Sequence, residues 1–203
     1  MSSLAGRGAL LLAGCVVLGV GVGMLLSADL GSDGFSTLVN GLSIALDVPF
    51  VVPNAIVSVA FLLLAAARGL RPGIGTLTQI VVVGLTVGWA HALIETPGTV
   101  LGQALLLVAA CPVVALGISA YLGAQLGAGP AESAALAWDP PMPFRWSYSA
   151  VQLFGAVVGW LLGATLGPGT LAVIVLLGPA VDLTSRLLGL DVRQGAASDP
   201  DSP

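Results

Sequence analysis

Six polar side chains in this apolar chain have the chemistry to bind a small solute. Each is a carboxylate or an amide, and each lies in or beside a stretch of apolar residues. They are Asp29, Asp33, Asn40, Gln79, Glu132 and Gln152. Ionisable groups inside a membrane are costly to insert and generally face a cavity or a partner group. We therefore take these six residues as the candidate substrate-binding residues.

Each of the six also has a purely structural interpretation. Asp29 and Asp33 follow a long apolar stretch, so both can lie at the membrane surface, where a charge costs little. Glu132 stands two residues after Pro130, where a carboxylate stabilises the positive end of a helix. The three amides can join helices through hydrogen bonds that contribute about 0.6 kcal/mol on average. The sequence leaves both interpretations open.

Other chemistry is not indicated by the residue pattern. The sequence has one histidine, His91, and no cluster of histidines, cysteines and carboxylates with metal-ligand spacing. The glycine-rich segments 6–8 and 73–75 lack the lysine of a phosphate-binding loop. Cys15 and Cys111 lie in apolar stretches, where a thiol acts as a small packing residue. We therefore expect no enzymatic activity, no catalytic residue, no metal and no cofactor.

The composition predicts a membrane protein. Of the 203 residues, 57% are hydrophobic and 8% are charged, and the mean hydropathy is +1.04. A soluble domain of this length needs far more polar surface, so the solvent of this chain is lipid. The six basic residues form no cluster, which argues against a nucleic-acid-binding surface. The expected partners are the lipid bilayer and a small solute, and the sequence does not indicate the oligomeric state.

The chain contains one pattern twice. The polar, glycine-rich break at residues 28–34 (ADLGSDG) has a counterpart at residues 124–130 (AQLGAGP), 96 residues later. Each break follows a long apolar stretch. Downstream, GIGTL at residues 73–77 matches GPGTL at residues 167–171, now 94 residues later. Self-similarity of this length is typical of an internal duplication.

The expected fold is an all-α membrane protein with six transmembrane helices. A bilayer is crossed by about 20 apolar residues in a helix. The six spans are expected at residues 8–27, 50–67, 75–93, 100–122, 146–166 and 170–188. Two further apolar elements, at residues 35–46 and 131–138, are too short to cross. They fit a broken or re-entrant segment, or an interfacial one.

The arginines predict the orientation of the chain. If the two short elements do not cross, all six arginines fall on one side of the membrane, whereas eight spans would divide them four to two. The positive-inside rule makes that side cytoplasmic and places both termini there. Each repeat, at about residues 8–95 and 99–190, then has three spans, so the second is inverted relative to the first. Residues 1–190 form a single polytopic membrane domain, and residues 191–203 are expected to be a disordered cytoplasmic tail.

Four motifs resemble those of a known family. They are ADLGSDGFSTLVNGLS, RPGIGTL, LGAGPAESAAL and GPGTL, in that order, and they flank the expected helices. On these motifs the chain resembles the YczE/YitT family of bacterial integral membrane proteins, and its YczE-like branch in particular. The resemblance implies a multi-pass protein of the bacterial plasma membrane, in a family often described as candidate transporters without an established activity. Gln152 stands where an acidic residue is frequent in that family, and Gln79 where an asparagine is frequent.

Two functions follow from these observations. The first is a secondary-transporter-like carrier with a solute site between the two breaks, because inverted repeats with broken helices are typical of such transporters. The alternative is a non-transporting membrane scaffold or a regulator of a partner protein. Convergence of the polar side chains on one cavity would favour the carrier. The sequence identifies neither the substrate nor the coupling ion.

Overall fold

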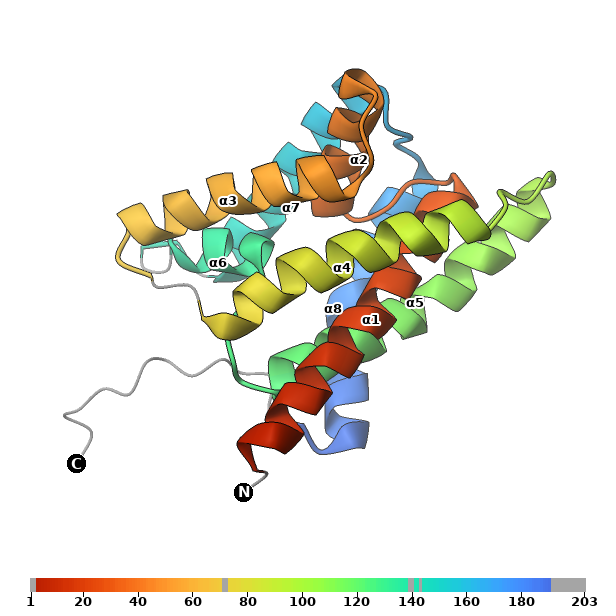
Figure 1. The fold of residues 1–203 in the computed structure, drawn as a ribbon. Helices are drawn as coiled ribbons and strands as arrows, with labels where there is room; N and C mark the ends of the chain where they lie inside the picture. Colours follow the sequence, from red (N-terminus) through yellow and green to blue (C-terminus); the bar gives the residue numbers. More distant parts are fainter. Residues whose placement is uncertain (1–2, 71–72, 139–140, 143, 191–203) are drawn as a thin grey trace.

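The computed structural model describes residues 3–70, 73–138, 141–142 and 144–190, and every regular element among them is an α-helix (Figure 1). The predicted tail at residues 191–203 lies outside this part of the chain. In order, the helices are α1 (Leu4–Ala28), α2 (Gly34–Leu46), α3 (Val51–Ala67), α4 (Ile74–Leu93), α5 (Val100–Gly123), α6 (Pro130–Leu136), α7 (Phe144–Leu161) and α8 (Pro168–Leu188). The predicted all-α fold is confirmed.

Three helices of the described part, α1, α4 and α5, are long and apolar enough to cross a membrane. The two parts of α8 meet at 42° beside Pro179 and make a fourth span if they are counted together. A proline removes a backbone hydrogen bond and bends a helix at this position. α3, with 17 residues, is slightly shorter than a usual span. The six-span arrangement therefore stays a prediction.

The outer surface of the helices is apolar. Leu63, Val108 and Leu153 are each more than 60% exposed, and all four tryptophans are exposed as well. A surface of this kind is unfavourable in water and matches the hydrocarbon of a bilayer. The exposed side chains therefore support a membrane location independently of the helix lengths.

The described helices form two groups of four. α1, α4, α5 and α8 pack together in one group, and α2, α3, α6 and α7 pack together in the other (Figure 1). The groups touch where α3 contacts α4 and where α7 contacts α8. The two groups thus leave a central region that side chains from both can reach.

The most extensive helix contact is the antiparallel crossing of α1 and α5. A Cβ atom on Gly21 would lie 2.8 Å from the backbone nitrogen of Val114, and one on Gly117 would lie 2.4 Å from that of Leu18. Contacting residue numbers rise along α1 as they fall along α5, so the helices run in opposite directions. Small residues let two backbones approach in this way, which is how helices associate tightly in a membrane.

The chain breaks after α1 and after α5, as the sequence predicts. Asp29 and Gln125 follow these two helices, and both have a φ angle of +52°. Gly31 and Gly127, two residues further on, also have positive φ angles. Left-handed residues of this kind end a helix and turn the chain. Because α1 and α5 are antiparallel, the two breaks lie at opposite ends of the pair.

Each break is hydrogen-bonded to the first turn of a helix in the other half of the chain. The N–H of Gly169 in α8 donates to the carbonyl of Leu30 at 2.9 Å, and the N–H of Gly75 in α4 donates to the carbonyl of Leu126 at 2.9 Å. The first amides of a helix have no partner within the helix. The carbonyls of the two breaks therefore act as hydrogen-bond acceptors for these free amides, and they gain a donor in the same bond.

The short helices α2 and α6 lie along the longer helices of their group. α2 packs closely on α7, with Gly34 against Gln152 and Gly41 against Gly159, so it runs in parallel from the middle of α7 toward its end. α6 packs on α3. Gly34 and Pro130, the first residues of α2 and α6, are buried, so each short helix begins in the interior of the bundle.

The α1–α5 crossing gives a first prediction. Gly117→Ala should lower the stability by about 1–3 kcal/mol, because the added methyl overlaps the backbone of α1. Gly88→Ala in α4 is the matched control, because no atom lies within 4 Å of its new Cβ and alanine raises helix propensity. Thermal unfolding of the purified variants in detergent measures both. Equal melting temperatures of the two variants would contradict the close crossing.

Candidate functional site

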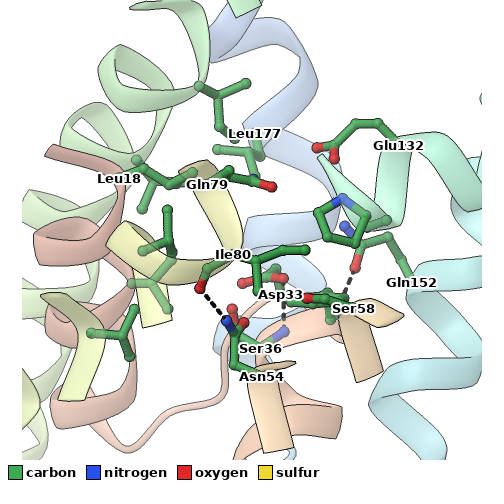
Figure 2. Close-up of a pocket in the computed structure, with 18 of the residues that line it drawn as sticks. Leu18, Asp33, Ser36, Asn54, Ser58, Gln79, Ile80, Glu132, Gln152 and Leu177 are labelled. Carbon is green, nitrogen blue, oxygen red and sulfur yellow. Dashed lines mark hydrogen bonds between the residues drawn. The ribbon is translucent and has the colours of Figure 1, made fainter. Parts of the chain in front are cut away.

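A polar cavity lies between the two groups of helices (Figure 2). Its volume is about 60 Å³, several times the roughly 10–15 Å³ that one water molecule needs. Each described helix contributes to its lining. The polar residues that line it are Asp33, Ser36, Asn54, Ser58, Gln79, Glu132, Tyr148 and Gln152. The rest of the lining is apolar, as in most small-molecule sites.

Four of the six predicted residues line this cavity, namely Asp33, Gln79, Glu132 and Gln152. The other two, Asp29 and Asn40, line a separate cavity of about 20 Å³ beside the end of α1. There the carboxylate of Asp29 is exposed and accepts a hydrogen bond from the hydroxyl of Thr165. The structure therefore does not bring these two residues to the central cavity.

Asp33 has two roles in the structure. It is the N-cap of α2, and its Oδ2 accepts a hydrogen bond from the backbone N–H of Ser36 at 3.0 Å. This bond satisfies one of the free amides at the start of the helix. Since α2 begins in the interior of the bundle, the capping carboxylate also lines the cavity. Asp33 thus caps α2 and lines the central cavity at the same time, and it does not lie at the exposed surface where the structural interpretation had placed it.

The ends of the Glu132 and Gln79 side chains both lie beside Gly129. A Cβ atom on Gly129 would lie 2.4 Å from Oε2 of Glu132 and 2.8 Å from Oε1 of Gln79, so the two oxygens are no more than about 5 Å apart. A larger residue at this position would push the ends of both side chains away. Asp33 lines the same cavity, and Figure 2 shows the three side chains around one space. Asp33 in the first break and Glu132, two residues after the second break, thus line one cavity.

The amides of Gln152 and Asn54 hold helices together around the cavity. Oε1 of Gln152 accepts a hydrogen bond from the backbone N–H of Phe35 at 3.0 Å, and its Nε2 donates to the hydroxyl of Tyr148 at 2.8 Å. Nδ2 of Asn54 donates to the carbonyl of Ile80 at 2.8 Å, which joins α3 to α4. The predicted role of an amide in joining helices is confirmed for Gln152.

Two other oxygens of the lining have no hydrogen-bond partner among the described residues. They are Oγ of Ser58, a residue that is 0% exposed, and Oε1 of Gln79, a residue that is 9% exposed. A buried polar atom without a partner costs about 1–3 kcal/mol. Both residues line the cavity, so their oxygens are free to accept a hydrogen bond or to contact a cation there.

Four polar lining residues were not singled out from the sequence: Ser36, Asn54, Ser58 and Tyr148. Small hydroxyl and amide side chains within apolar helices are ordinary packing residues, so nothing marked them individually. The internal repeat could have identified these residues. Its two offsets, 96 and 94 residues, pair residues of the first half that line the cavity with residues of the second half that also line it. Ser36 is 96 residues before Glu132, Asn54 is 94 before Tyr148, and Ser58 is 94 before Gln152.

The titratable residues elsewhere form no metal site in the described part of the chain. Cys15 is buried in the apolar core, and both cysteines are free thiols. Nδ1 of His91 lies 2.9 Å from the hydroxyl of Ser27, and His91 does not line the central cavity. The chemistry of the described residues is therefore concentrated in the central cavity.

The fold and the cavity define a polytopic α-helical membrane protein with a polar site at its centre. Residues 5–186 match a family of unknown function, DUF6198, and the protein belongs to this family. An uncharacterized protein of Haemophilus influenzae is 25% identical over 174 residues, which cover 85% of this chain and 80% of the relative.

A second relative supports the predicted resemblance. The uncharacterized membrane protein YczE of Bacillus subtilis is 24% identical over 113 residues, which cover 53% of this chain and 51% of YczE. The match thus spans about half the length of that relative. The predicted YczE-like family and the membrane location are confirmed. No solved structure matches the chain.

The two roles of Asp33 can be separated by mutation. Asp33→Asn and Asp33→Ala both remove the charge, but asparagine caps a helix about as well as aspartate. Asp33→Ala should therefore be less stable than Asp33→Asn by about 1 kcal/mol. Thermal unfolding in detergent gives the comparison. If the two variants unfold at the same temperature, the bond from Ser36 does not stabilise α2.

Proposed function

We propose that this protein is a secondary-transporter-like carrier that moves a small solute across the bacterial plasma membrane without enzymatic chemistry. One observation carries the proposal: Asp33 and Glu132, which follow the breaks after α1 and α5, line the same cavity. Non-helical backbone at membrane depth is tolerated where it lines such a cavity, and transporters place their substrate sites there.

The helix contacts support two inverted repeats of three spans and one short helix each. If α1, α2, α3 and α4 correspond to α5, α6, α7 and α8, each main contact has a counterpart. Thus α1–α4 corresponds to α5–α8, α2–α7 to α3–α6, α2–α3 to α6–α7, and α3–α4 to α7–α8. The antiparallel α1–α5 pair corresponds to itself, which is the geometry of a two-fold axis in the membrane plane.

Two arginines support the orientation of the chain. Nε of Arg7 donates to the carbonyl of Ala124 at 2.8 Å, and Nε of Arg68 donates to the carbonyl of Ala137 at 3.0 Å. Both arginines therefore lie at the end of the molecule that holds the second break. By the positive-inside rule this end is cytoplasmic, and the first break faces the outside.

The breaks provide a means of alternating access. Each lies between the cavity and one membrane face, and each is held by a single described backbone bond, Leu30 to Gly169 or Leu126 to Gly75. Side-chain bonds add to each of them, from Thr165 to Asp29 in the first break and from Thr76 to Ala128 and Arg7 to Ala124 in the second. A bound solute shifts the equilibrium toward an open state only by its difference in affinity for the two states. Releasing one break while the other stays closed would open the cavity to one side at a time.

Thiol labelling tests the proposal in a background where both native cysteines are replaced by alanine. Ser58→Cys lines the cavity, whereas Leu63→Cys on the same helix is 66% exposed on the apolar outer surface. A charged methanethiosulfonate is larger than the cavity of about 60 Å³, so it should label Ser58→Cys in membranes only when the cavity opens to one side. It should leave Leu63→Cys unlabelled, because it reacts only where water reaches the thiol. If Ser58→Cys is labelled from neither side, no aqueous path reaches the cavity, and the scaffold alternative replaces the carrier.

The same reagent tests the inverted arrangement. Asp29→Cys and Gln125→Cys occupy corresponding exposed positions of the two breaks. In intact cells Asp29→Cys should be labelled at once, and Gln125→Cys only after the cytoplasmic side is made accessible. Labelling of both positions from the outside would contradict the inverted topology.

A further inference from the structure

We infer that the central cavity binds one small monovalent cation through oxygen ligands, so that the carried species either is this cation or is coupled to it. The inference rests on the proposed function, because it takes the cavity as the binding site, and it adds the chemical class of the ligand. Three properties of the cavity carry it: its charge, its free oxygen atoms and its size.

The charge of the cavity is negative. Asp33 and Glu132 are the charged residues of its lining, and no arginine or histidine is among the described side chains there. The N-termini of α2 and α6 offset part of this charge, since the first turn of a helix carries about half a positive charge. The offset is smaller for α6, which has only seven residues. When both carboxyl groups are ionised, about one negative charge is left. A bound monovalent cation neutralises this charge and at the same time favours the ionised state of the two groups.

The free oxygens point to the same ligand. Oγ of Ser58 and Oε1 of Gln79 are buried acceptors without a partner among the described residues. Together with the carboxylates of Asp33 and Glu132, they form a set of oxygens contributed by α3, α4, α6 and the first break (Figure 2). Oxygen ligands suit hard metal cations, and the same atoms accept hydrogen bonds from an ammonium group.

The size and the walls of the cavity restrict the ligand further. A volume of about 60 Å³ accommodates an alkali cation with a few waters, or a small ammonium ion, but not a bulky quaternary amine. The walls include Leu18, Val22 and Val114, which keep the local dielectric low. Low dielectric strengthens the attraction between the carboxylates and a cation.

Binding is tested on the purified full-length protein in detergent, in a buffer free of alkali and ammonium ions. Sodium, lithium, potassium, ammonium and methylammonium chlorides are each titrated at constant ionic strength, with choline chloride as the bulky control. At least one small cation should raise the melting temperature in a saturable way, and choline should not. Comparison of the alkali-metal salts with the ammonium salts shows whether the site binds a metal ion or an ammonium group. If no small cation acts differently from choline, the inference is wrong.

Variants locate the binding in the cavity. Asp33→Asn, Glu132→Gln and Gln79→Met should each raise the half-saturating cation concentration about tenfold or more. The first two each remove a negative charge, and the third removes an oxygen ligand. Asp47→Asn is the matched control at the other end of α2, where the residue is exposed and left-handed, a conformation that asparagine accepts. If the cation stabilises every cavity variant as it does the parent protein, it binds elsewhere and the inference fails. Three independent cavity variants keep the test decisive if one of them does not fold.

The outcomes also separate this inference from the proposed function. Saturable cation binding that depends on Glu132, with no labelling of Ser58→Cys from either side, supports the cation site and contradicts the carrier. Labelling of Ser58→Cys with no cation effect supports a water-accessible carrier and overturns the cation site. Flux of the bound cation into proteoliposomes, reduced in Glu132→Gln, supports both.

Discussion

The backbone contact between α1 and α5 is the constraint on which the rest of the structure depends. Gly21 and Gly117 bring the two helices so close that no side chain separates them at the crossing. The hydrophobic effect, which drives helices together in water, is absent in lipid. Close packing of this kind has to hold the two helices together instead. Because the pair is antiparallel, the breaks that follow the two helices are placed at opposite ends, and the cavity lies between them.

Both short helices begin in the interior because their glycines let them enter it. Gly34 and Gly41 place the backbone of α2 directly on α7, and Gly129 leaves room for Glu132 and Gln79 at the start of α6. Polar N-terminal turns would be costly next to lipid. Here they face a cavity that supplies polar partners, so the same residues that make the short helices tolerable also make a site.

The sequence predicted the parts of this structure that depend on local chemistry. Left-handed and glycine-rich breaks at residues 28–34 and 124–130 interrupt apolar stretches, and a carboxylate beside each break is conspicuous in lipid. What could not be predicted depends on tertiary packing. Asn40 lies too far along α2 to reach the central cavity and lines the smaller one, while Ser58 reaches it only because α3 joins the group of α2 and α7. The repeat offsets related Ser58 to Gln152, but a serine in an apolar helix carries no signal of its own.

The bonds between the breaks and the opposite half of the chain have a consequence for biosynthesis. Asp29 and its partner Thr165 are separated by 136 residues, and Leu30 finds Gly169 only when α8 has been made. Contacts of such long sequence separation form late and slowly. When the first half of the chain is made, the glycine face of α1 therefore has no partner until α5 follows, and the first break has none until α8 follows.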